Sequence, residues 1–229
     1  MQDTAVYTKL PDRAAIKITG NDRSSFLQGL ITQDIDLLQS HDLIYSCLLT
    51  PNGKFLFDFF IFRHDDHLMI DCEGGELAES LLKRLAMFKL RSDVALELEP
   101  TFDVWQVFNG DYETKYGDPR FDGYRVYSKP HDANEVNFND WDEYRIRREI
   151  PDGSRDMIPE KSFLHESHVI LDNAVSFTKG CYMGQELVSR MHHRGLVKKQ
   201  LRCMALDAVP DDAELRSACG GVGLSLVKL

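Results

Sequence analysis

Hydrophobic residues in the first part of the chain alternate between strand-like and helix-like spacing, which predicts an α+β fold. Runs rich in β-branched and aromatic residues predict strands at 14–19, 43–49, 55–62, 67–72, 94–99, 104–108 and 124–127. The sequence Thr50-Pro51-Asn52-Gly53, between the second and third of these runs, is typical of a hairpin turn. Short β-like runs after residue 196 predict a small β unit.

Two longer segments have apolar residues at helical spacing. Residues 76–89 place leucines and a phenylalanine on one face, the pattern of a helix that packs against a core. A second helix is predicted over 184–194, closed by Gly195 in the left-handed conformation. The stretch 151–178 between them lacks a clear period, so we expect it to be mostly irregular.

Acidic residues mark the expected starts of two further helices. Asp22 is predicted to cap a short helix that follows it, because an aspartate side chain can accept a hydrogen bond from the first turn. Asp140 is expected to begin another helix, with Glu143 closing a capping box.

Composition is that of a globular protein. The chain has 229 residues, of which 43% are hydrophobic and 28% charged, enough for one large domain or several small interlocked ones. No apolar stretch approaches the roughly 18 residues of a membrane helix, so no membrane contact is expected. The first residues show no apolar segment typical of a secretory signal. We therefore expect the cytoplasm, or the mitochondrial matrix in a eukaryote.

The net charge of −10 argues against a direct nucleic-acid partner, because phosphate binding usually needs a basic face. Six basic residues nevertheless lie between Lys179 and Arg202, against the single acid Glu186, and form a local anion-attracting patch. The five cysteines show no CxxC spacing, and adjacent histidines at 192–193 would diverge on a helix. No metal site is predicted.

The segment 179–186 carries the clearest chemical signal. Gly180 and Gly184 flank Cys181 just before the predicted helix, where a neighbouring lysine and a helix N-terminus favour thiolate character. Arg190 and Arg194 lie one turn apart on one face and can bind carboxylates. From spacing alone, a glycine-containing turn with a buried cysteine and a solvated basic helix is an equally good interpretation.

The sequence of this segment, KGCYMGQE, resembles the signature of the YgfZ family, the folate-binding relatives of the glycine cleavage system T-protein. Segments 16–34, 48–59, 144–151 and 158–163 are similar to further family segments in the expected order. The resemblance implies a T-protein-like fold, with interleaved α+β domains around a central channel. It divides the chain into a folate-binding region at 1–195, built of two interleaved subdomains, and a short β-barrel-like unit at 196–229.

The same resemblance implies the site. Cys181 would be the functional thiol and Lys179 its partner in catalysis. The residues expected to bind tetrahydrofolate or another reduced folate are Asp58, Arg145, Gly180, Tyr182, Gly184, Gln185, Glu186, Arg190 and Arg194. The chain departs from the family at Glu149, where a glycine is usual, and at Phe57-Asp58, where the T-protein has adjacent aspartates.

The implied function is a folate-binding accessory protein that supports assembly or repair of iron–sulfur enzymes, including tRNA-modifying ones. Its partners would be iron–sulfur proteins or assembly factors. The alternative is a tetrahydrofolate-dependent aminomethyl or one-carbon transferase. Phe57 argues against it, because a cationic aminomethyl intermediate needs nearby carboxylates. A third interpretation is a noncatalytic scaffold in which Cys181 is structural.

Overall fold

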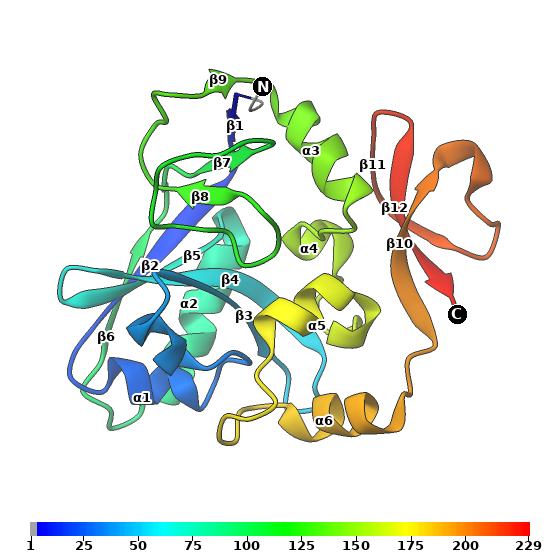
Figure 1. Cartoon of the computed structure of the whole chain (residues 1–229). Helices are drawn as coiled ribbons and strands as arrows, with labels where there is room; N and C mark the ends of the chain where they lie inside the picture. Colours follow the sequence, from blue (N-terminus) through cyan, green and yellow to red (C-terminus); the bar gives the residue numbers. More distant parts are fainter. Residues whose placement is uncertain (1–3) are drawn as a thin grey trace.

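The largest sheet in the computed structural model, which describes residues 4–229, has five antiparallel strands (Figure 1). In spatial order they are β3 (Leu43–Leu49), β4 (Phe55–His64), β5 (His67–Glu73), β2 (Arg13–Thr19) and β6 (Ala95–Glu99). All five were predicted to within a few residues. The Thr50–Gly53 hairpin is confirmed as well, since Gly53 donates a backbone hydrogen bond to Thr50.

A second sheet is formed by segments that alternate along the chain with those of the first sheet. Its strands, in order, are β8 (Tyr124–Val126), β7 (Trp105–Phe108), β1 (Val6–Lys9) and β9 (Asn134–Glu135). The chain passes from this sheet to the first between β1 and β2, and returns between β6 and β7. Two such crossings bind the sheets into one interleaved unit, as the family resemblance implies.

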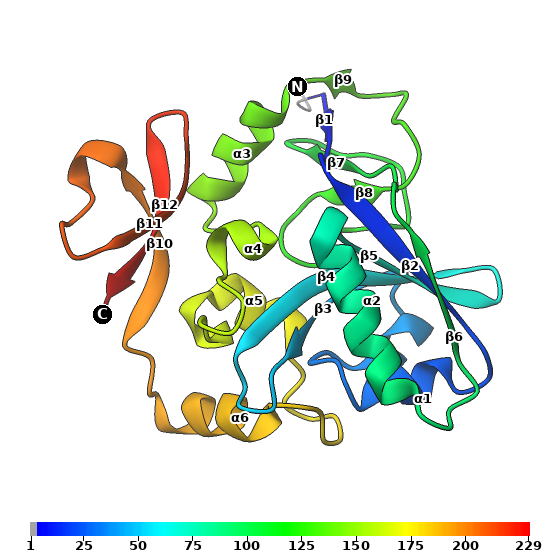
Figure 2. The ribbon, with the colours of Figure 1, turned by 180° about the vertical axis from the view of Figure 1, so that it is seen from behind.

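The five-stranded sheet is buried on both faces. One face packs against α1 (Arg23–Gln28) and α2 (Gly75–Lys89), with Ile16, Phe59 and Leu85 in the shared core (Figure 2). The other face packs against α5 (His168–Ala174) and α6 (Gln185–Arg194) through residues such as Phe60 and Val188. Because neighbouring residues of a strand point to opposite faces, β4 supplies aromatic rings to both cores.

The C-terminal residues form a third, open antiparallel sheet of β10 (Lys199–Ala205), β12 (Val222–Lys228) and β11 (Glu214–Cys219), in that order. It packs against α3 (Phe138–Arg147) and α4 (Gly153–Asp156). Three short 3₁₀ turns complete the described elements: η1 (Ile35–Gln39), η2 (Leu164–Glu166) and η3 (Leu206–Ala208). As predicted, α6 ends at Gly195, whose φ of 59° is left-handed.

Three local predictions are wrong. The Asp22 carboxylate does not cap α1; it accepts a hydrogen bond from the Asp93 backbone N–H (2.8 Å) across a connecting loop. Helix α3 begins at Phe138 instead of Asp140, because Asn137 is its cap and Asp140 closes the capping box. The segment 151–178 contains α4, η2 and α5, so it is more regular than expected.

Candidate functional site

A cavity of about 310 Å³ lies between β4, the start of β2, α3 and α4. Its lining combines charged groups with aromatic rings. The arginines are Arg13, Arg120, Arg125, Arg145 and Arg155; the acids are Asp12, Asp58, Glu73 and Asp152; the rings are Phe60, Phe138 and Trp141. Rings and a few polar groups around such a volume are typical of a small-molecule site. We call this the central cavity.

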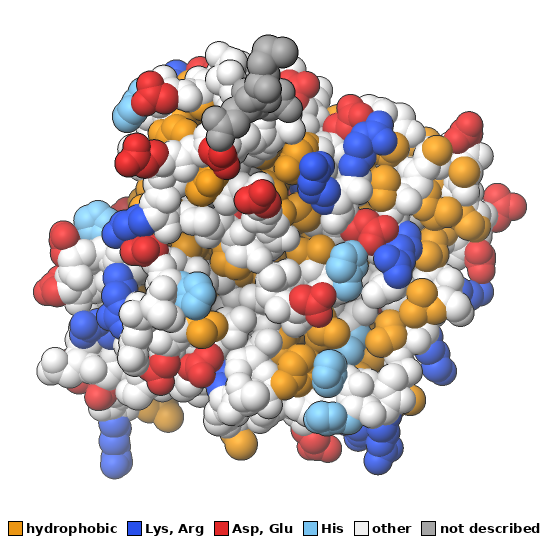
Figure 3. All heavy atoms as spheres, in the orientation of Figure 1, with side chains coloured by type: hydrophobic (Ala, Val, Ile, Leu, Met, Phe, Trp, Pro, Cys, Tyr) orange, Lys and Arg blue, Asp and Glu red, His pale blue; other side chains and the backbone are white. Residues whose placement is uncertain are grey.

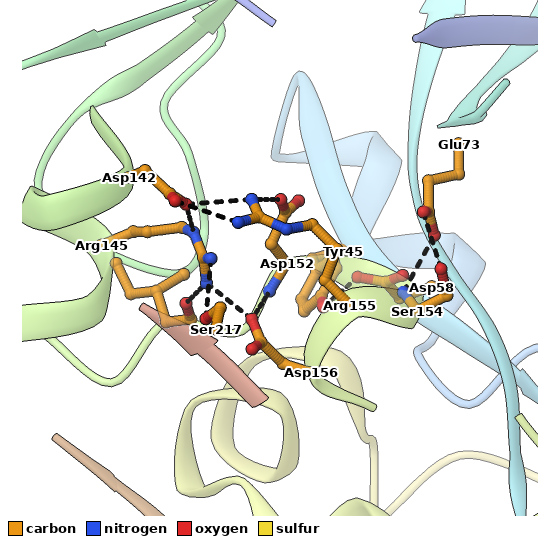
Figure 4. Close-up of polar contacts among 11 residues, drawn as sticks. Tyr45, Asp58, Glu73, Asp142, Arg145, Asp152, Ser154, Arg155, Asp156 and Ser217 are labelled. Carbon is orange, nitrogen blue, oxygen red and sulfur yellow. Dashed lines mark hydrogen bonds and ion pairs between the residues drawn. The ribbon is translucent and has the colours of Figure 1, made fainter. Parts of the chain in front are cut away.

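Asp58 faces the central cavity because of its position on β4. It lies on the same side of the strand as Phe60, which also lines the cavity, whereas Phe57 packs with Phe59 on the opposite face. The hydroxyl of Tyr45 donates a hydrogen bond to Asp58 (2.6 Å; Figure 4). Burial raises the pKa of Asp58, although the Tyr45 hydrogen bond opposes this shift.

Glu73, at the end of the neighbouring strand β5, is a second carboxylate with a raised pKa, caused by burial. The backbone N–H and the hydroxyl of Ser154 donate to its two oxygens (2.9 and 2.8 Å; Figure 4). Between the two acids lies Gly153, with φ +43°; an added Cβ would come within 2.4 Å of Glu73 and 3.3 Å of Asp58. Asp58 and Glu73 therefore form a carboxylate pair that needs a glycine beside it.

Asp71 organises the arginines at one side of the cavity. Its fully buried carboxylate accepts hydrogen bonds from Arg13 (2.7 Å) and Arg125. Burial alone would raise the pKa of Asp71, but the two guanidinium charges outweigh it and hold the pKa below its usual range. Arg125 lies 4.1 Å from the centre of the Phe60 ring, and its buried Nη2 has no acceptor within residues 4–229. A ligand oxygen in the cavity would satisfy that donor.

Arg145, which was predicted to bind folate, lines the central cavity, but its guanidinium is engaged inside the fold (Figure 4). It donates to Asp142 (2.7 Å), Asp156 (2.6 Å) and Ser217 Oγ (3.0 Å). These contacts join α3, α4 and β11. The structure thus assigns Arg145 the task of attaching the C-terminal sheet to the cavity wall.

The segment 179–186 does not line the central cavity. Cys181 is exposed, and Lys179 points away into the fold. The Lys179 ammonium donates to the backbone carbonyls of Gln28 (2.8 Å), Ile31 (2.9 Å) and Gln33 (2.9 Å). Burial lowers the pKa of Lys179 to about 8. Lys179 is therefore a clamp that fixes the loop to the end of α1.

Gly184 fixes the other end of this loop. It has a φ of +82°, and an added Cβ would meet Thr50 O at 2.7 Å and Gly53 Cα at 2.9 Å, in the β3–β4 hairpin. At Gly180 an added Cβ would meet nothing within 4 Å. Tyr182 is buried between these positions, and burial raises its pKa.

The remaining predicted residues lie along α6 and its surroundings. Gln185 and Glu186 form the first turn, Glu186 makes a 3.9 Å ion pair with Arg190, and Arg194 is exposed. The basic patch is partly neutralised. Lys179 and Arg190 have the partners given above. In addition, Lys199 pairs with Glu214, and Arg202 pairs with Glu149.

Glu149, the departure from the family pattern, has a φ of +57°, a conformation that favours glycine. Its carboxylate accepts hydrogen bonds from the Cys203 backbone N–H (3.0 Å) and from Arg202 (3.0 Å). These two hydrogen bonds join β10 to the end of α3. They help to offset the unfavourable backbone conformation of Glu149.

The sequence reasoning missed most of the charged residues of the cavity, namely Asp12, Arg13, Glu73, Arg120, Arg125, Asp152 and Arg155, and it missed Asp71 beside them. One signal was available: Asp71 interrupts an apolar strand at a position that faces a core, where a charge requires a partner. Within residues 4–229 the side chains form no cluster of three or more metal-binding groups. The same residues include no helix that is long and apolar enough to span a membrane.

The fold is that of the glycine cleavage T-protein. The structure superposes on glycine cleavage system aminomethyltransferase T from Bartonella henselae with a TM-score of 0.75 over 99% of this chain and 79% of that chain. At 14% identity this likeness shows the fold alone, and it confirms the predicted α+β T-protein-like architecture. No family model matches the chain.

Sequence similarity points to a narrower group within that fold. The chain is 32% identical to iron-sulfur cluster assembly factor IBA57 homolog, mitochondrial, of Pyricularia oryzae, over 93% of this chain and 61% of that protein. It is 29% identical to iron-sulfur cluster assembly factor IBA57, mitochondrial, of Mus musculus, over 84% of this chain and 64% of that protein. It spans about three fifths of the length of these curated relatives. Both are named as mitochondrial, the compartment that the prediction allowed for a eukaryote.

Proposed function

We propose that this chain is a folate-binding accessory protein, related to the YgfZ family, that supports assembly or repair of iron–sulfur enzymes, including tRNA-modifying ones. Its partners would be iron–sulfur proteins or assembly factors, and its compartment that of its named relatives. The similarity to two iron–sulfur cluster assembly factors over most of the chain supports this role.

The observation that carries the proposal is the exposure of Cys181 on a loop fixed at both ends. Lys179 holds one end on α1, and the Gly184 contact holds the other on the β3–β4 hairpin. A thiol presented in this way can reach a partner without any change in the fold. Because iron–sulfur clusters are usually held by several thiolates, Cys181 would share its cargo with ligands from the partner.

The central cavity fits the pterin end of a reduced folate, which would carry a one-carbon unit when bound. Asp58 and Glu73 supply acceptors for the amino and ring N–H groups of a pterin, and the buried Arg125 Nη2 supplies a donor for its oxygen. Phe60 and Trp141 provide apolar walls. The region 1–195 would hold the folate, and 196–229 would support the cavity wall through the hydrogen bond from Arg145 to Ser217.

The first test is complementation of a strain that lacks its own copy of the protein. We expect Cys181→Ser to fold normally and to fail to restore the activity of an iron–sulfur enzyme. Cys47→Ser, at a buried cysteine outside the loop, is the comparison variant. Thermal unfolding would show that Cys181→Ser is folded. Full restoration by Cys181→Ser would refute a functional role for the thiol.

A tetrahydrofolate-dependent aminomethyl or one-carbon transferase is the second candidate, and one observation favours it. Position 57 faces away from the central cavity, so the phenylalanine there removes no carboxylate from the cavity, and Asp58 is in place. Release of ammonia from an aminomethyl donor, dependent on tetrahydrofolate and lost in Asp58→Asn, would support this activity. Whether the chain turns over a substrate is decided by that assay.

A further inference from the structure

A second cavity, of about 380 Å³, lies between residues 158–166, the end of α6 and the C-terminal sheet. It shares no lining residue with the central cavity. Figure 3 shows hydrophobic, histidine and basic side chains gathered over α6 and the neighbouring C-terminal sheet. We call this space the lateral cavity. Nothing in the proposed function uses it.

The lining of the lateral cavity combines apolar and basic residues. Its apolar residues are Ile158, Phe163, Met191, Leu196, Val197 and Leu226; its basic residues are Lys161, Lys198, Lys199 and Arg216. Its two acids are Glu166 and Glu214. Glu214 is already bound to Lys199 (2.7 Å) and Arg216 (3.0 Å). The balance is positive, so an anionic group is favoured over a cationic one.

Two buried polar atoms that belong to residues lining this cavity have no hydrogen-bond partner within residues 4–229. They are Nε of Arg216, whose side chain is 9% exposed, and Nε2 of His165, which is 2% exposed. An unpaired buried donor or acceptor is unfavourable, so two beside one cavity indicate a ligand. Burial lowers the pKa of His165 to about 4, so this ring is neutral at physiological pH and Arg216 carries the charge.

We propose that the lateral cavity binds a small organic carboxylate with an apolar body. The carboxylate would accept a hydrogen bond from Arg216 Nε, and the body would lie against Phe163 and Leu196. An arginine favours a carboxylate here because its N–H groups form charge-assisted hydrogen bonds with carboxylate oxygens. The proposal stands apart from folate binding, since the two cavities share no lining residue.

The test uses two carboxylate probes, 4-phenylbutyrate and octanoate, and one matched neutral compound, 4-phenylbutyramide, in titration calorimetry on the full chain. We expect both carboxylates to bind with a Kd below about 1 mM and the amide to bind roughly tenfold more weakly or worse. Asp58→Asn should leave these affinities unchanged, which separates this site from the central cavity. Equal binding of acid and amide, or no binding of either carboxylate, overturns the proposal.

Variants locate the site. Leu196→Glu places a negative charge in the lateral cavity and should weaken carboxylate binding by roughly tenfold or more. Leu215→Glu is the matched control, because Leu215 is similarly exposed (49% against 46%) and does not line the cavity. Arg216→Gln should weaken binding roughly tenfold, with partial recovery in Arg216→Lys. Equal losses in Leu196→Glu and Leu215→Glu would refute the assigned site.

Discussion

The central cavity and the 179–186 loop are built in opposite ways. The cavity gathers charges from positions between 12 and 155, and buried carboxylates beside it pair with several of its arginines. The loop is one continuous segment that leaves its thiol in solvent and is anchored through backbone groups of α1 and the β3–β4 hairpin. Burial of a side chain in the cavity is therefore a sign of structure or of ligand binding, whereas the function proposed for the loop depends on the exposure of its thiol.

A second contrast separates two aspartates of this region, Asp71 beside the cavity and Asp58 in its lining. Asp71 is paired with two arginines and has a lowered pKa. Asp58 has one hydroxyl partner and a raised pKa. A carboxylate that folding stabilises is structural, whereas one that burial disfavours is retained for another reason, here the proposed ligand.

The largest effect should come from Asp71→Asn, which leaves Arg13 and Arg125 without their buried partner. We expect a loss of about 3–5 kcal/mol in the free energy of unfolding, measured by urea denaturation. Asp103→Asn is the control, because the Lys9–Asp103 pair (2.7 Å) is more than half exposed and should contribute about 0–1 kcal/mol. Similar losses in the two variants would contradict the structural role of Asp71.

Gly184→Ala tests the anchoring of the loop. The added methyl group would contact Thr50 O in a backbone conformation that favours glycine, so we expect a loss of about 1–3 kcal/mol and weaker complementation. Gly180→Ala is matched to it in the same loop and has open space, so its unfolding free energy should change by no more than about 0.5 kcal/mol. If both variants behave alike, the hairpin contact does not hold the loop.

Lys179 predicts a pH dependence. Its pKa of about 8 in the folded protein lies below its value in the unfolded chain, so between these values the unfolded state binds more protons. Stability from this group should therefore rise with pH, by about 1–2 kcal/mol between about pH 8 and pH 10 after allowance for solvent screening. Urea denaturation of wild type and Lys179→Met across this range measures the difference. If the difference in unfolding free energy between wild type and Lys179→Met does not change with pH, the ammonium is not held in a desolvated state.

The smallest effect on stability separates binding from structure. Because the raised pKa of Asp58 makes its ionised form unfavourable above that pKa, Asp58→Asn should stabilise the fold at neutral pH by about 0.5–1 kcal/mol. The same variant should bind tetrahydrofolate roughly tenfold more weakly in calorimetry, because an amide cannot replace a carboxylate toward two N–H donors. If Asp58→Asn is destabilised and its folate affinity is unchanged, Asp58 has a structural role like that of Asp71.

Local patterns predicted most of the fold because short-range physics decides them. The Thr50–Gly53 turn, the apolar face of 76–89 and the left-handed Gly195 depend on neighbours in sequence. Asp22 and Asp140 were misassigned for the converse reason. Asp22 accepts a hydrogen bond from the backbone N–H of Asp93, which is distant in sequence. Asn137 caps α3, and Asp140 completes its capping box.

The sequence by itself determined the Cys181 loop, because an octapeptide carries its thiol, its lysine and its glycines together. It also determined the strands, through the alternation of apolar residues. Only the tertiary structure decided that Lys179 binds backbone carbonyls, that Arg145 is internally paired, and that Asp58 and Glu73 meet beside Gly153. A charged residue has the same letter whether its partner is a ligand or a side chain many residues away, and its burial and pairing exist only once the sheets have closed around it.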